Sequence, residues 1–129
     1  MLVDLDKYSE TPIDSIQMPK AFREALRDTL QKIDCYKDDM RLSYVFLFGS
    51  VARGEALFGS DIDLLLLTNA STEREVRTKV IQYDLEDDTA YIPVQITVRK
   101  TLRFLDEDAD VCDFNKIILP DLVLLRRYL

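Results

Sequence analysis

Two short pairs of polar residues, separated by ten positions, carry the side chains in this sequence that could do chemistry. Gly49 and Ser50 follow an apolar stretch, and Asp61 and Asp63 open the next one. If that second stretch is a strand, alternation of its side chains places both carboxylates on one face and the intervening isoleucine on the other. Carboxylates so close together could share one hard cation or bridge a pair, and ligands made of oxygen alone favour Mg²⁺ or Mn²⁺.

The Gly-Ser pair could hold phosphate. Gly49 lets the backbone approach a ligand closely, and a helix starting after Ser50 would offer free N–H groups beside the hydroxyl. A phosphate cradle beside a two-carboxylate metal site suits phosphoryl or nucleotidyl transfer. Neither pair is specific alone, because Asp-x-Asp is commonly a solvated strand end and Gly-Ser a turn with a helix cap. The prediction rests on their combination between two apolar strands.

Two strands and two helices must position these pairs. Residues 42–48 are aromatic and β-branched and predict a buried strand; residues 61–68, with four consecutive leucines, predict a second. Apolar side chains recur at three- and four-residue steps over residues 19–36, which predicts a helix with its proline in the first turn. Thr72, three residues before a glutamate, predicts the capped start of another helix.

The rest of the chain completes a small α/β (α+β) domain. Residues 91–98 predict a third strand, and Pro93 within it suggests an edge position or a strand start. Residues 101–129 read as one or two short helices, divided near Pro120. This order indicates a small mixed sheet with helices packed on it, and the short link between the first two strands permits an antiparallel pair. The polar first residues, 1–14, are expected to form a loosely attached arm.

Composition and charge argue against several classes of function. Seventeen basic and 24 acidic residues give a net charge of −7, which disfavours a long nucleic acid as partner but allows a small nucleotide held with metal ions. The chain has no histidine, and Cys35 and Cys112 lack a CxxC spacing, which argues against zinc and against a histidine base. Without a signal peptide or a bilayer-length apolar run, we expect one cytoplasmic domain, with no membrane partner, over residues 1–129.

The stretch that contains both polar pairs resembles a known signature. FGSVARGE at 48–55, followed by SDIDLL at 60–65, is similar to the motif of the DNA polymerase β-type nucleotidyltransferase superfamily. The greatest likeness is to the minimal nucleotidyltransferases of prokaryotes, which are often antitoxins paired with all-helical HEPN-domain toxins. The resemblance covers the chain in outline, but only this stretch of it is specific.

The resemblance implies a function for each motif residue. A nucleoside triphosphate such as ATP would be held by Gly49 and Ser50, and two Mg²⁺ ions by Asp61 and Asp63. An acceptor hydroxyl would attack the α-phosphate, and pyrophosphate would leave. Arg53 matches the motif arginine, and it could contact phosphate or could pair with the glutamate two positions on in an exposed turn.

The chain departs from the family pattern at one position. Active members carry a third carboxylate on the next strand, whereas the matching stretch here, residues 93–97, places Gln95 there. A neutral amide cannot accept the proton of the attacking hydroxyl, and its carbonyl is a weaker metal ligand. Three explanations stay open: transfer is weak or absent, the strand is misaligned, or another carboxylate reaches the metals. The candidates for that carboxylate are Asp84, Glu86, Asp87 and Asp88.

These observations leave several hypotheses open. The first is an enzyme that moves AMP from ATP to an acceptor hydroxyl, for which the resembled family offers protein tyrosines and RNA ends. The second is a catalytically weak or inactive module that binds nucleotide or docks on a partner such as a HEPN-type toxin. The leucine-rich end, residues 117–129, could cover such a partner or close the domain's own core as a final helix. A small domain that never binds nucleotide is the third. A homo-oligomer also stays open.

Overall fold

The computed structural model describes residues 3–86, 91–105 and 114–128. Among these residues, no helix combines the length and the apolar character needed to cross a membrane. The elements, in chain order, are two 3₁₀ turns (Leu5–Lys7 and Ile13–Ser15), α1 (Lys20–Tyr36), β1 (Leu42–Phe48), α2 (Gly49–Ala52), β2 (Ile62–Thr68), α3 (Glu73–Gln82), β3 (Val94–Lys100), α4 (Thr101–Leu105), α5 (Phe114–Ile118), a 3₁₀ turn (Leu119–Asp121) and β4 (Val123–Arg127).

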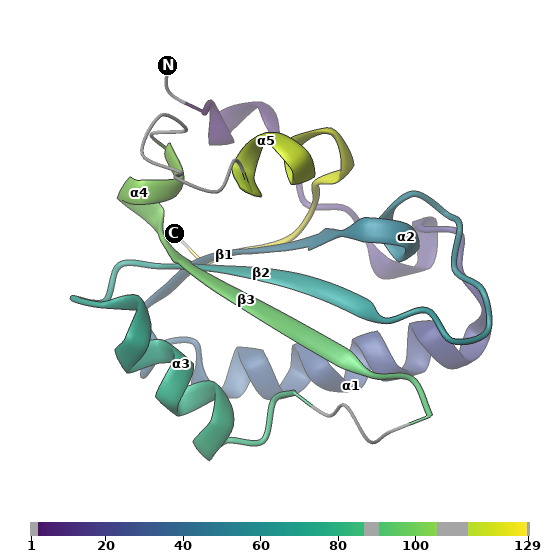
Figure 1. The fold of residues 1–129 in the computed structure, drawn as a ribbon, viewed down its shortest axis with the longest axis horizontal. Coiled ribbons are helices and arrows are strands. Elements are labelled where there is room, and N and C mark those ends of the chain that lie inside the picture. The colour runs from purple at the N-terminus through teal and green to yellow at the C-terminus, as the bar shows by residue number, and fades with distance from the viewer. Residues whose placement is uncertain (1–2, 87–90, 106–113, 129) are drawn as a thin grey trace.

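The strands form one mixed sheet in the order β3-β2-β1-β4 (Figure 1). β1 is antiparallel to both β2 and β4, whereas β2 and β3 are parallel and joined through α3. The first two strands thus form the antiparallel pair that their short link permits. β3 is an edge strand that starts directly after Pro93, which agrees with a proline at a strand start, where its missing N–H leaves no ladder bond unmade.

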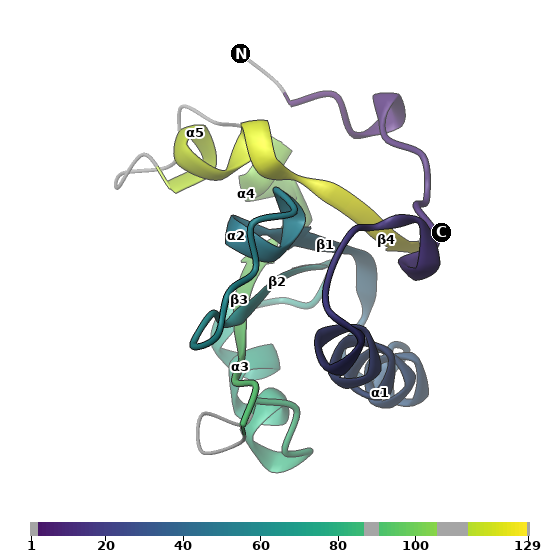
Figure 2. The ribbon, with the colours of Figure 1, turned by 90° about the vertical axis from the view of Figure 1, so that its right-hand side faces the viewer.

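Helices cover both faces of the sheet, and Figure 2 shows α1 and α3 on one side and α4, α5 and the N-terminal segment on the other. β2 supplies side chains to both layers: Leu64 and Leu66 belong to the core under α1 and α3, and Leu65 and Leu67 to the opposite core. A strand buried on both faces loses the usual alternation of apolar and polar residues. This explains the run of four leucines.

The two helices on the first face, α1 and α3, begin at residues that are typical of helix starts. α1 starts after Pro19 and buries Phe22 and Leu26 on one stripe. The Thr72 hydroxyl accepts a hydrogen bond from the backbone N–H of Glu75 at 3.1 Å and caps α3, which supports the capped start predicted for this helix.

The secondary structure of the C-terminal segment differs from the sequence prediction. Residues 123–127 form a strand, β4, whereas the sequence predicts a helix that closes the core or covers a partner. Leu124 and Leu125 are both buried, on opposite cores, and β4 pairs with the free edge of β1. A short apolar run does not distinguish strand from helix by its periodicity. The unpaired edge of a central strand, which only the assembled sheet provides, decides the outcome here.

The N-terminal arm is packed on the body of the protein, in contrast with the loose attachment expected from its polar composition. Val3 and Leu5 are buried, and the N–H of Val3 donates to the carbonyl of Leu105 at 2.7 Å. The Arg127 guanidinium donates to the carbonyls of Leu5 and Tyr8, at 3.2 and 2.6 Å. These contacts bind the arm to β4 and α4.

Candidate active site

The first turn of α2 lies against a carboxylate of β2. Gly49 starts α2 with φ of +80°, a left-handed conformation that L side chains rarely adopt. A Cβ atom at this position would lie 2.6 Å from Oδ2 of Asp63. The antiparallel register pairs Phe48 with Asp63 and so brings the Gly-Ser turn beside the carboxylate. The structure therefore brings together two of the residues that the sequence separates by fourteen positions.

Both motif aspartates lie at the start of β2. Asp61 precedes the strand and Asp63 lies within it, each half-buried, while Ile62 between them is fully buried in the core on the other face. Burial raises the pKa of Asp63 to about 6, and the negative charge of Asp61 adds to the shift, whereas the positive charge of Arg53 opposes it. The two carboxylates thus share one surface and repel each other at neutral pH.

Gln95 stands directly beside this pair. The parallel register sets Gln95 on β3 opposite Asp63 on β2. Its side chain is exposed, and its Nε2 donates a hydrogen bond to Oδ2 of Asp61 at 3.0 Å. The structure thus brings Gln95 and the aspartates together, as the predicted strand alignment requires.

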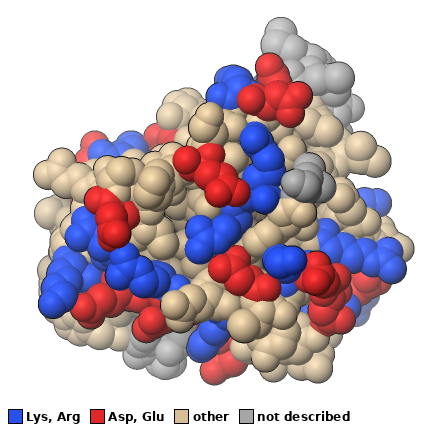
Figure 3. Space-filling model, turned by 180° about the vertical axis from the view of Figure 1, so that it is seen from behind, with Lys and Arg blue, Asp and Glu red and all other residues tan. Residues whose placement is uncertain are grey.

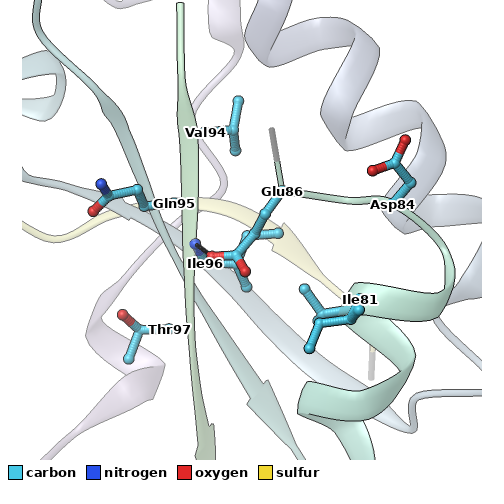
Figure 4. Close-up of a pocket in the computed structure, with 8 residues that line it drawn as sticks. Ile81, Asp84, Glu86, Val94, Gln95, Ile96 and Thr97 are labelled. Carbon is cyan, nitrogen blue, oxygen red and sulfur yellow. Dashed lines mark hydrogen bonds between the residues drawn. The ribbon is translucent and has the colours of Figure 1, made fainter. Parts of the chain in front are cut away.

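Two of the alternative carboxylates lie away from the aspartates. Figure 4 shows Gln95 and Thr97 on one side of β3, and Glu86 and Asp84 on the other, around a cavity of about 410 Å³. Glu86 is already engaged, because its carboxylate accepts hydrogen bonds from the N–H of Ile96 at 2.7 Å and from a guanidinium on α3 at 3.0 Å. The other two candidates, at positions 87 and 88, lie outside the described residues.

Arg53 is held by two carboxylates in this structure. Its Nε donates to Glu55 at 3.0 Å, and its Nη1 donates to Asp121 at 2.7 Å. The pairing with Glu55 is one of the two roles that the sequence leaves open. Asp121 is missed by sequence reasoning, because it follows α5 in a 3₁₀ turn and no local motif marks a partner 68 positions away. In the described part of the chain, the hydroxyl of Ser50 has no hydrogen-bond partner.

The donor set fits a hard cation held jointly with phosphate. Within residues 3–86, 91–105 and 114–128, no group of three or more His, Cys, Asp or Glu side chains could hold a metal ion. Mg²⁺ is commonly bound through one or two carboxylates together with substrate phosphates, and Asp61 and Asp63 supply two. On the face in Figure 3, basic and acidic side chains are interspersed.

Comparison with known proteins then decides the family. A family model described as a nucleotidyltransferase domain matches residues 23–121, a span that contains every site residue described above. This chain belongs to that family. The nucleotidyltransferase domain also resembles a solved structure, a candidate nucleotidyltransferase from Sulfolobus solfataricus determined at 1.40 Å. The two chains are 19% identical, with a TM-score of 0.50 over 88% of this chain and 94% of that one.

At this identity, the structural likeness shows the nucleotidyltransferase fold alone. A search of curated proteins finds no match. The family assignment therefore rests on the domain model, and the fold on the solved structure.

Proposed function

We propose that this domain binds a nucleoside triphosphate, with ATP as the expected donor, and transfers its nucleoside monophosphate to an acceptor hydroxyl. The observation that carries the proposal is the contact between Gly49 and Asp63. It sets the first turn of α2, which contains Ser50, against the Asp63 carboxylate. Nucleotidyl transfer requires hydrogen-bond donors that hold the phosphates and carboxylates that hold the metal, placed side by side.

The proposed roles follow from the positions of the side chains. Asp61 and Asp63 hold Mg²⁺, which would neutralise charge on the phosphates and on the leaving pyrophosphate. Ser50 and the first turn of α2 bind the triphosphate. The Arg53 guanidinium opposes the upward shift of the Asp63 pKa, so its charge already acts on this site and would act on a bound phosphate too.

A second function, a nucleotide-binding module with weak transfer, is favoured by one observation. The amide of Gln95 lies beside Asp61, where it can donate a hydrogen bond but cannot remove a proton from an acceptor. General-base catalysis typically contributes about 10²–10⁴-fold, so its loss would leave binding intact and transfer slow. The HEPN-type toxin partner stays a prediction. Within the C-terminal segment that could have covered such a partner, residues 123–127 pair with β1 as strand β4.

The first test compares two glycines that share a backbone conformation. Gly49 and Gly59 have φ of +80° and +92°, but a Cβ at Gly59 would have no atom within 4 Å. Gly49→Ala should weaken Mg²⁺-dependent ATP binding, measured by calorimetry, by at least about tenfold, since it displaces the Asp63 carboxylate. Gly59→Ala should bind as the wild type does. Equal binding by both variants would contradict the assignment of Gly49.

Transfer itself is tested with ATP labelled at the α-phosphate, incubated with candidate acceptor proteins and RNAs. Asp61→Asn and Asp63→Asn should each abolish label transfer, because each removes a charged metal ligand. A variant that transfers label as well as the wild-type protein would remove the enzymatic proposal.

A further inference from the structure

The number of metal ions at this site follows from the chemistry of one side chain. β3 lies in register beside the aspartates of β2, so a further side-chain ligand for a second cation would come from this strand. The residue found there is Gln95, opposite Asp63. An amide offers one acceptor oxygen, and its nitrogen is a donor that cannot bind a cation.

The orientation of this amide is determined by its partner. The atom of Gln95 that lies 3.0 Å from Oδ2 of Asp61 must be the NH₂ group, because a carboxylate oxygen and an amide oxygen would repel each other at that distance. The NH₂ group therefore lies between Asp61 and β3 and presents a donor to the carboxylate, where a second cation would require an oxygen ligand. Its partial positive charge satisfies Asp61 in place of that ion.

The other carboxylates near this site are already engaged and do not replace an acid on β3. Glu86 lies across β3 and is occupied by the backbone of Ile96 and by a guanidinium. Asp121 is already paired with Arg53 at 2.7 Å.

We infer that this site holds one divalent cation, bound by Asp61 and Asp63 together with the triphosphate, and that the Gln95 amide excludes a second. The inference rests on the proposed function, since it concerns the same site. One cation is enough to hold the phosphates of a nucleotide, but a second is what activates and positions an attacking hydroxyl in two-metal sites. The site therefore binds the nucleotide but activates the attacking hydroxyl poorly.

The test counts bound ions, with a readout independent of turnover. The full chain is saturated with α,β-methylene ATP, which resists cleavage at the bond concerned, and titrated with Mn²⁺, whose free fraction is read by electron paramagnetic resonance. The wild-type complex should bind one Mn²⁺. Gln95→Glu, which replaces the amide by an isosteric carboxylate, should bind two, and so should the shorter acid in Gln95→Asp.

Thr97→Glu is the matched control, because Thr97 lies on the same face of β3, two residues further along the strand. It adds the same charge away from Asp61 and should leave the count at one. Two ions on the wild-type protein, or one on both Gln95 variants with unchanged circular dichroism, would overturn the inference while leaving the proposed function in place. Failure of the wild-type chain to bind either nucleotide or Mn²⁺ would overturn the proposed function as well.

Discussion

At the scale of one residue, the charge of Asp63 that would bind a metal also destabilises the folded protein. Its carboxylate is half-buried, lies against Gly49 and has the charge of Asp61 beside it, so its pKa is raised from 3.8 to about 6. The folded protein therefore holds this proton more tightly than the unfolded chain does. Above about pH 6 the ionised group destabilises the folded state, and the penalty is relieved as the pH falls toward 3.8.

Removing this charge should stabilise the metal-free protein. We expect Asp63→Asn to raise the free energy of unfolding at pH 7 by about 1 kcal/mol, after allowing for solvent screening of a half-buried group. The gain should shrink on acidification from about pH 6 to pH 4, as urea unfolding across this range would show. Asp28→Asn, at an exposed position of α1, is the control. A gain that stays constant with pH would contradict the raised pKa.

At the scale of the element, β3 is an edge strand whose backbone groups are partly covered by side chains. The outward N–H and carbonyl of Ile96 are bound by the Glu86 carboxylate at 2.7 Å and by the Arg77 guanidinium at 2.6 Å. The two side chains also form an ion pair at 3.0 Å. They occupy the place of a neighbouring strand, and thereby limit pairing of the exposed edge with another chain.

Glu86→Ala should expose this edge. The N–H of Ile96 would lose its acceptor, which should lower the free energy of unfolding by about 1–2 kcal/mol and accelerate hydrogen exchange of that amide. Glu24→Ala is a suitable control, because Glu24 is 60% exposed and its ion pair with Lys20 is long, at 3.8 Å. Unchanged exchange at Ile96 in Glu86→Ala would show that the carboxylate does not protect the edge.

At the scale of the whole molecule, the first and last described segments hold each other in place. β4 completes the sheet along β1, and the N-terminal arm packs over it. Arg127 joins the two, since its guanidinium binds the carbonyls of Leu5 and Tyr8 and its backbone N–H donates to the Glu10 carboxylate at 2.8 Å. The same guanidinium lies 5.7 Å from the centre of the Tyr44 ring on β1.

Arg127→Ala should release the arm while leaving the sheet folded. Two carbonyls would lose their donor, so we expect a loss of about 1–3 kcal/mol and faster proteolysis within residues 3–11. Arg74→Ala, at an exposed position of α3, should leave proteolysis unchanged. Cleavage at the wild-type rate in Arg127→Ala would mean that the apolar contacts of Val3 and Leu5 hold the arm by themselves.

The sequence by itself determined the features that depend on neighbouring residues. The strand over 42–48 was predicted with its observed bounds, and the helix after Pro19 within one residue. The shared face of Asp61 and Asp63 follows from strand alternation alone. The fold class and the nucleotidyltransferase resemblance also depend on short motifs and on their order, which a single sequence contains.

Only the tertiary structure decided which distant segments meet. β4 is a strand because β1 offers it a free edge, and the apolar run Leu122–Leu125 is too short to have a period that could reveal this. The pairing of Arg53 with Asp121 joins residues 68 positions apart. The hydrogen bond from Gln95 to Asp61 exists because β2 and β3 are parallel and in register. Such contacts arise when packing brings together surfaces that local propensity does not relate to each other.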